Sequence, residues 1–264
     1  MKRNIDNLLQ DYYNLYTEDD RLTKDKTHYI EYVTTMKYID KYIKKGNKII
    51  EIGAGTGAYS LELARKGYDV TALELSENNL SILKSKITPE MNIKALQGNA
   101  LDLSMIEDES YDITLVLGPL YHIFTKEEQN KVIEEAIRVT KKDGYIYYAF
   151  ILTDITFLEW GFKRENFVSN FGNDKMIDEN YKPINKEELI FYLSNMEEVK
   201  KLINNHNQKE ITYVATDGIG RIIKDTINEM DEETYNHYLN YHLTICERED
   251  LIGYSGHIIA IAQK

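Results

Sequence analysis

The sequence predicts an α/β fold in which a mostly parallel sheet is covered by helices on both faces. Apolar strands alternate with helical segments between residues 47 and 152, and the strand Ile113–Leu117 is almost entirely apolar. Alternation of this kind is typical of parallel sheets, and a nearly continuous apolar strand indicates that both faces are covered. A glycine-rich loop, residues 53–57, joins the first of these strands to a helix.

Two helices are expected ahead of the alternating region. Asn4–Tyr16 predicts a short helix, and His28–Lys44 predicts a longer one that Gly46 ends. Apolar residues follow one face of the second helix with a 3.6-residue period, at Ile30, Val33, Met36, Ile39 and Ile43.

The alternating region predicts five strands and three helices. The strands are expected at Lys48–Ile52, Asp69–Leu75, Asn92–Gln97, Tyr111–Leu117 and Tyr145–Leu152. The helices are expected at Tyr59–Lys66, Glu77–Lys86 and Lys126–Thr140. Thr125 and Glu128 have the spacing of a capping box at the start of the last helix.

The regular alternation is lost after residue 152. We interpret Thr153–Asn185 as an insertion that forms a helical lid. Helices are expected at Lys186–Ser194, Met196–His206, Ile219–Met230 and Glu232–Cys246, and strands at Ile211–Thr216 and His257–Gln263. The last two strands are expected to form the antiparallel edge of a seven-stranded mixed sheet.

Composition limits the function classes that fit. The chain has 264 residues and a formal net charge of -12, whereas nucleic-acid binders are usually basic, so we expect no nucleic-acid partner. The single cysteine, Cys246, excludes an intramolecular disulfide and favours a reducing compartment. The polar start of the chain shows no signal peptide and no segment is apolar enough for a membrane span, so we expect a cytoplasmic protein.

The glycine loop indicates what kind of ligand the fold binds. Gly53, Gly55 and Gly57 have G-x-G-x-G spacing, unlike the G-x-G-x-x-G of dinucleotide-binding proteins. Glu51, two residues before the loop, would disfavour a pyrophosphate but suit a cation such as the sulfonium and ammonium of S-adenosylmethionine. Glu74 ends the next strand, where an acid commonly accepts hydrogen bonds from ribose hydroxyls.

These segments together resemble the class I S-adenosylmethionine-dependent methyltransferases, in the form found in many bacterial small-molecule enzymes. The motifs are Glu51–Gly57, Glu74, Gln97–Asp102 and Tyr111–His122, and the resemblance covers roughly residues 40–152. It implies a Rossmann-like fold and S-adenosylmethionine as cofactor. The cofactor-binding residues it implies are Glu51, Gly53, Ala54, Gly55, Gly57, Glu74, Leu75, Asn99, Ala100, Leu101 and Leu117. Many members have Asp where this chain has Asn99, whose carbonyl can still accept from an adenine amino group.

The resemblance also divides the chain into parts. We expect a single methyltransferase domain over residues 1–264, with an N-terminal helical cap at 1–46 and a cofactor-binding core at 47–152. The lid insertion occupies 153–195, and 196–264 completes the core with a helical insertion.

The fourth strand carries the candidate catalytic residue. Enzymes that methylate nucleobases or glutamine often have an Asn or Asp where this chain has Gly118, so these substrates are disfavoured. His122 follows directly and could act as a general base. Tyr121, Tyr16, Trp160 and His242 are candidate substrate contacts. One His and one Cys on the late helix do not form a metal site, so no metal is expected.

We therefore predict transfer of a methyl group from S-adenosylmethionine to an oxygen, nitrogen or sulfur of a small metabolite. The alternatives are a methyltransferase that acts on a protein, a non-catalytic cofactor-binding module, and an NAD-dependent oxidoreductase on a Rossmann-like fold. The sequence does not predict the oligomeric state.

Overall fold

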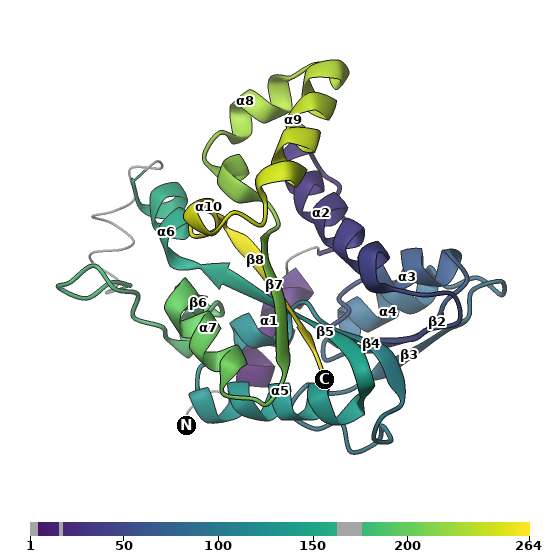
Figure 1. The fold of residues 1–264 in the computed structure, drawn as a ribbon. Helices are drawn as coiled ribbons and strands as arrows, with labels where there is room; N and C mark the ends of the chain where they lie inside the picture. Colours follow the sequence, from purple (N-terminus) through teal and green to yellow (C-terminus); the bar gives the residue numbers. More distant parts are fainter. Residues whose placement is uncertain (1–4, 16–17, 163–175) are drawn as a thin grey trace.

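The computed structural model describes residues 5–15, 18–162 and 176–264 and is built around one eight-stranded sheet (Figure 1). The strand order is β3-β2-β1-β4-β5-β8-β7, and the short β6 pairs with β5 beside this path. The strands are β1 (Lys48–Ile52), β2 (Asp69–Glu74), β3 (Ile93–Gln97), β4 (Tyr111–Val116), β5 (Thr140–Leu152), β6 (Leu193–Ser194), β7 (Lys209–Ala215) and β8 (His257–Gln263). Strands β1 to β5 pair in parallel, and β8 runs antiparallel to both neighbours. The predicted mixed α/β sheet is confirmed, with one short strand more than expected.

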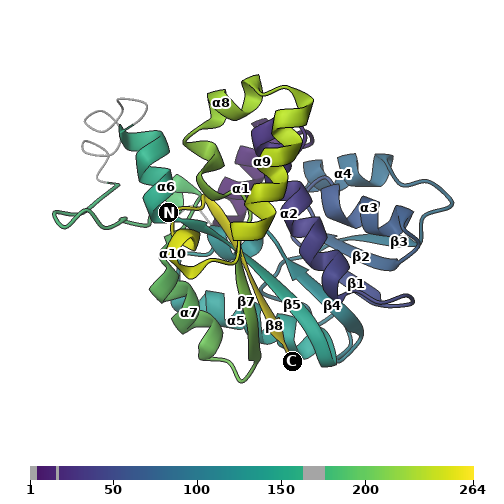
Figure 2. The same ribbon diagram turned by 45° about the horizontal axis from the view of Figure 1, so that its top comes forward.

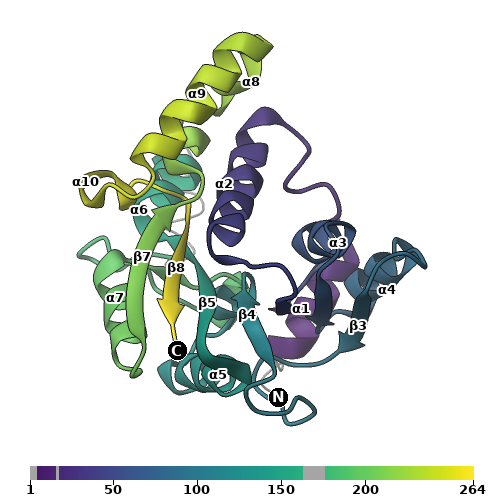
Figure 3. The ribbon, with the colours of Figure 1, turned by 45° about the vertical axis from the view of Figure 1, so that its right-hand side comes forward.

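The longer helices cover both faces of the sheet. Figures 2 and 3 show α2, α3 and α4 on one face and α5 and α7 on the other. The helices are α1 (Ile5–Leu15), α2 (Lys26–Tyr42), α3 (Ala58–Arg65), α4 (Glu77–Ser85), α5 (Lys126–Val139), α6 (Thr153–Thr156), α7 (Met196–Asn204), α8 (Lys224–Glu229), α9 (Glu232–Ile245) and α10 (Glu249–Ile252). Chain order reverses between β1 and β4, which is the point where open α/β sheets bind ligands.

Side-chain caps explain where several helices begin. Ser76 accepts a hydrogen bond from the backbone of Asn79 at the start of α4, and Thr125 accepts one from Glu128 at the start of α5. A cap of this kind satisfies one of the free N–H groups of the first turn. Burial then fixes which face packs inward, because Val132, Ile133 and other apolar residues of α5 are fully covered.

The core lies between the sheet and its helices. The central strands supply most of its fully covered side chains, among them Ile49, Ile50 and Ile52 of β1. Two large tyrosines on β5 are also fully buried. Tyr147 donates its hydroxyl to the backbone oxygen of Tyr38, and Tyr148 donates to Gln208, so neither polar group lacks a partner.

The second half of the chain departs from two sequence predictions. The helix predicted over Lys186–Ser194 is wrong: only a short 3₁₀ turn, Glu187–Leu189, forms before β6. Ile190 adopts a positive φ of 67°, which ends the turn, and the side chain of Asn185 hydrogen-bonds both backbone groups of Leu193. The helix predicted over Ile219–Met230 is divided into a 3₁₀ turn, Gly218–Arg221, and α8.

The C-terminal strands bring distant residues to the ligand-binding edge of the sheet. Because β8 is antiparallel to β5, its first residue, His257, pairs with Ile151 near the carboxyl end of β5. Helices α8 and α9 extend beyond the sheet and pack against α2 (Figure 1), where Ile30, Ile227 and Tyr235 form a separate apolar cluster. Within the described residues, no helix combines the length and apolar character needed to cross a bilayer.

Candidate active site

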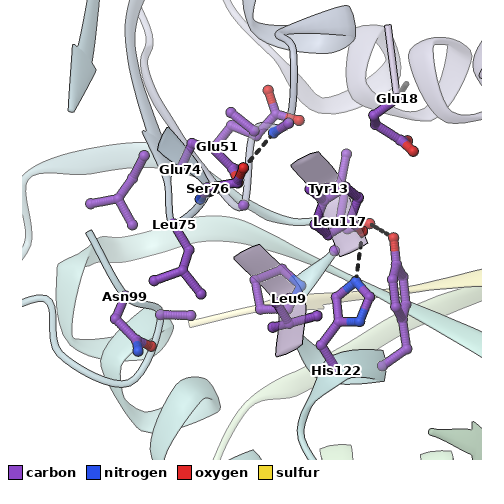
Figure 4. Close-up of a pocket in the computed structure, with 18 of the residues that line it drawn as sticks. Leu9, Tyr13, Glu18, Glu51, Glu74, Leu75, Ser76, Asn99, Leu117 and His122 are labelled. Carbon is purple, nitrogen blue, oxygen red and sulfur yellow. Dashed lines mark hydrogen bonds between the residues drawn. The ribbon is translucent and has the colours of Figure 1, made fainter. Parts of the chain in front are cut away.

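A cavity of about 180 Å³ lies at the carboxyl edge of β1, β2 and β4, beneath α1 (Figure 4). Most of the predicted cofactor-binding residues line it. They are Glu51, Gly53, Ala54, Gly55, Glu74, Leu75, Asn99, Ala100, Leu101 and Leu117, together with Tyr121 and His122. In the view of Figure 4, Asn99 lies toward one end of this first cavity and Glu18 toward the other.

The three glycines of the loop have different roles. All three have positive φ, but a Cβ on Gly53 would lie 2.7 Å from Pro119, and one on Gly57 would lie 3.0 Å from Leu61. These two positions therefore need glycine for packing as well as for the turn. A Cβ on Gly55 would meet only Glu18, at an ordinary contact distance of 3.7 Å, so the backbone of Gly55 is the part of the loop that a ligand can approach.

Glu51 is a buried carboxyl group in the first cavity. Its side chain accepts a hydrogen bond from the hydroxyl of Ser60 and is only 2% exposed. Burial raises its pKa to about 8, and the groups that shift this pKa include no cation. A carboxyl group placed in this way is neutral near pH 7 but becomes a strong site for a ligand cation.

Glu74 is the second buried carboxylate, at the end of β2. One oxygen accepts from the backbone N–H of Gly55 at 2.7 Å, and the other accepts from Ser76 at 2.8 Å. The side chain of Asn79 also hydrogen-bonds to Glu74, and together these bonds hold the carboxylate facing the cavity (Figure 4) with room for a further donor. Burial raises the pKa of Glu74, despite these hydrogen bonds.

Asn99 lies where the third strand ends, as predicted. It forms a hydrogen bond with Asp6, a partner that the sequence did not indicate. Its side-chain oxygen accepts from the backbone of Leu101 at 2.9 Å, and its amide donates to Asp6 of α1 at 3.3 Å. Asp6 also lines the cavity. The two side chains place acceptor oxygens together at this end of the cavity.

His122 uses both ring nitrogens within the protein. Nδ1 lies 2.9 Å from the backbone oxygen of Ile190 and so carries the proton, which leaves Nε2 to accept from the hydroxyl of Tyr13, also at 2.9 Å. Burial lowers the pKa of His122 to about 4. A neutral imidazole with both nitrogens occupied is better placed to anchor Tyr13 than to accept a substrate proton.

A second cavity, of about 370 Å³, adjoins the first and shares Tyr13, Glu18, Arg21 and Tyr121 with it. Trp160, a predicted substrate contact, lines this second cavity. His242 lines neither cavity; it is buried beside Gly218. Tyr16 lies outside the described residues.

Several residues that line the cavities were missed by the sequence analysis. Leu9 and Gln10 reach the first cavity from α1, and Gln10 donates to the backbone oxygen of Leu75. Their only sequence signal is the recurrence of apolar and aromatic residues along the first helix. Asp217 and His257, in the second cavity, follow β7 and begin β8. The predicted antiparallel edge could have indicated that these two positions meet.

Comparison with known proteins agrees with the fold. Residues 49–144 match a family described as a methyltransferase domain. A demethylmenaquinone methyltransferase of Staphylococcus aureus is 32% identical over 103 residues, 36% of this chain and 42% of that protein. A putative ribosomal RNA large subunit methyltransferase of Methanocaldococcus jannaschii is 29% identical over 116 residues, 41% of this chain and 29% of that protein. The chain therefore spans less than half the length of these curated relatives.

A solved structure shares the fold along nearly the whole chain. The magnesium protoporphyrin IX methyltransferase of Synechocystis, with bound S-adenosylhomocysteine, has a TM-score of 0.58 and 12% identity, and covers 99% of this chain and 100% of that one. Identity at this level establishes the fold alone. Residues 49–144 are therefore similar to a methyltransferase domain, and the chain as a whole shares the fold of a methyltransferase solved with bound S-adenosylhomocysteine.

Proposed function

We propose that this protein transfers a methyl group from S-adenosylmethionine to a nitrogen, oxygen or sulfur atom of a small molecule. The observation that carries the proposal is the pair of buried carboxyl groups, Glu51 and Glu74, in one cavity at the point where chain order reverses. Burying two acids without a cation is costly, and a ligand that is cationic and rich in hydroxyl donors offsets this cost.

The residues of the first cavity fit this cofactor. Glu51 suits its ammonium group, and Glu74 can accept a hydrogen bond from a ribose hydroxyl. Asn99 and Asp6 supply acceptors for an adenine amino group. When bound, S-adenosylmethionine supplies a methyl group activated by its positive sulfur. The chain's own task is to align the acceptor atom and keep water away.

The second cavity supports a small molecule as the methyl acceptor. It is walled by side chains from α1, α2 and β8 and borders the first cavity at Tyr13 and Tyr121. A net charge of -12 disfavours RNA, even though one relative is named as a ribosomal RNA methyltransferase. Gly118 also stands where enzymes acting on nucleobases often have an Asn or Asp. The proposal therefore places a metabolite, and neither RNA nor a protein, in the second cavity.

Calorimetric titration with S-adenosylhomocysteine and, separately, with NAD tests the cofactor. We expect S-adenosylhomocysteine to bind and NAD not to bind. Binding of NAD without binding of S-adenosylhomocysteine would favour an oxidoreductase. Turnover is then measured with S-adenosylmethionine labelled on its methyl group, against a metabolite panel, a ribosomal RNA transcript and a protein extract. Label that enters only RNA or only protein would contradict the small-molecule proposal.

A further inference from the structure

The second cavity contains a carboxylate–imidazole pair that the first cavity and its cofactor leave unused. Asp217 follows β7, His257 begins β8, and His257 Nδ1 lies 2.9 Å from Asp217 Oδ2. Both side chains line the second cavity, next to the residues that it shares with the first. The antiparallel pairing of β7 with β8 brings these two positions, forty residues apart in the chain, to the same edge of the sheet.

Asp217 is held in one orientation and in its charged form. Its Oδ1 accepts from the backbone N–H groups of Gly256 at 2.8 Å and His257 at 3.0 Å, and the side chain is 3% exposed. Burial alone would raise the pKa of Asp217, but hydrogen bonding from His257 and the charge of Arg221 hold it well below its usual range. A carboxylate that is fixed and ionised can orient an imidazole.

The contacts of His257 decide which ring nitrogen is free. Nδ1 faces two carboxylates, Asp217 at 2.9 Å and Glu31 at 3.4 Å, and because a carboxylate only accepts, Nδ1 carries the proton. No described residue forms a hydrogen bond with Nε2, although the side chain lines the cavity. Nε2 is therefore an unoccupied acceptor whose tautomer is fixed by its partner, the arrangement used by general bases.

The charged residues around His257 come from three segments of the chain. Glu18 and Arg21 precede α2, Glu31 lies on α2, and Asp217 and Arg221 lie in the turn after β7. The charge of His257 affects the pKa of three of these carboxylates, Glu18, Glu31 and Asp217. They would stabilise an imidazolium, but with Glu159 the cavity has four carboxylates, and the four cations Arg21, Lys24, Arg221 and Lys224 also line it, so the lining carries no excess charge. A metal ion is disfavoured here because Arg21 already donates two hydrogen bonds to Glu31.

We propose that His257 is the general base of the methyl transfer, that Asp217 positions it, and that the acceptor atom in the second cavity carries a proton which must be removed. This inference rests on the proposed function. The acceptor group gives this proton to Nε2, and the lone pair that is freed forms the new bond to the methyl carbon. The C–S bond of the cofactor breaks with its electron pair remaining on sulfur, and the imidazolium later returns its proton to water.

Nitrogen NMR on protein labelled with ¹⁵N-histidine tests the tautomer without any substrate. The signals that His257→Gln removes are expected to show a protonated Nδ1 and an unprotonated Nε2 at pH 8. A proton on Nε2 would overturn the proposal. Asp217→Asn is expected to change the ratio of the two His257 tautomers, because it removes the adjacent negative charge, and no change would contradict the positioning role.

Turnover with a panel of small amines, phenols and thiols tests the chemistry. His257→Gln is expected to lower the kcat/KM for the methyl acceptor about 10²-fold or more, and Asp217→Asn is expected to lower it by a smaller factor. His237→Gln and Asp225→Asn, both exposed, serve as matched controls that leave kcat/KM unchanged.

Calorimetry separates failure of this inference from failure of the proposed function. Wild type and His257→Gln are expected to bind S-adenosylhomocysteine equally, because His257 does not line the first cavity. Equal binding of S-adenosylhomocysteine with full methyl-transfer activity in His257→Gln would overturn the role of His257 as the base. Loss of activity on adding EDTA, restored by a divalent metal, would also overturn the proposal. Absence of binding in wild type would instead contradict the proposed function.

Discussion

The hydroxyl of Tyr13 and Nε2 of His122 lie 2.9 Å apart and join α1 to the loop after β4 across the first cavity. Two further hydrogen bonds hold the same helix in place: Gln10 donates to the backbone of Leu75, and Asn78 donates to the backbone of Tyr13. Helix α1 thus covers the cavity through polar contacts, and Leu9 is the one residue of this helix that is fully buried. We infer that its attachment governs how quickly the cofactor exchanges.

Tyr13→Phe is expected to accelerate release of S-adenosylhomocysteine. The change removes the donor and leaves Nε2 of His122 buried without a partner, at a cost of about 1–2 kcal/mol, or roughly tenfold in the dissociation rate. Stopped-flow displacement measures this rate. Tyr254→Phe, at an exposed tyrosine, is the control. An unchanged rate would show that α1 does not limit exchange.

Glu74→Gln is expected to weaken binding of S-adenosylhomocysteine by about tenfold to a hundredfold. The substitution keeps the size of the side chain but removes the charge that strengthens hydrogen bonds to ribose hydroxyls, worth about 1.5–3 kcal/mol in such cases. Calorimetry gives the affinity, and Glu107→Gln on the surface is the matched control. Equal affinity in both variants would contradict the role assigned to Glu74.

The cofactor side of the site could be predicted because its signals are local. Strand β1, the glycine loop and Glu74 lie within 27 residues of each other, and the fold brings them together through one strand–helix–strand unit. Position along β2 alone places Glu74 at the carboxyl edge of the sheet. The sequence motifs therefore indicated the first cavity and most of its predicted lining residues.

The residues missed by the sequence analysis depend on contacts between distant segments. Tyr13 reaches His122 across 109 positions; the aromatic residues of the first helix suggested a cover near the site, but not this hydrogen bond. His257 was passed over because its importance arises from the pairing of β8 with β5 and β7. His122 was prominent in its motif, but its local sequence could not show that Ile190 and Tyr13 occupy both nitrogens.

His122 is expected to make the folded protein sensitive to acid. Its pKa is lowered by burial to about 4 in the folded state, whereas an unfolded histidine titrates near 6.5. The unfolded state therefore binds more protons between these values, so stability is complete above about pH 6.5 and falls as pH decreases toward 4. His122→Gln is expected to flatten this part of a urea-denaturation profile, and His237→Gln is not. Parallel profiles for wild type and His122→Gln would contradict the assignment.

Glu51 is expected to release a proton when S-adenosylmethionine binds. Its pKa is raised by burial to about 8, so the carboxyl group is largely protonated at pH 7, and a cationic ligand beside it favours the charged form. Calorimetry at pH 7 in two buffers of different ionisation enthalpy is expected to show close to one proton released in wild type and none in Glu51→Gln. Glu107→Gln is expected to match wild type.

The same titration predicts how stability without ligand depends on pH. Because the pKa of Glu51 is raised in the folded state, the unfolded state loses its proton first, and stability falls as pH rises from about 4.5 to 8. Glu51→Gln cannot ionise, so it is expected to be more stable than wild type above pH 7 while binding the cofactor less tightly. Higher stability combined with weaker cofactor binding in this variant would show that the carboxyl group of Glu51 serves ligand binding and not folding. A variant less stable than wild type at pH 8 would show that Glu51 serves the fold.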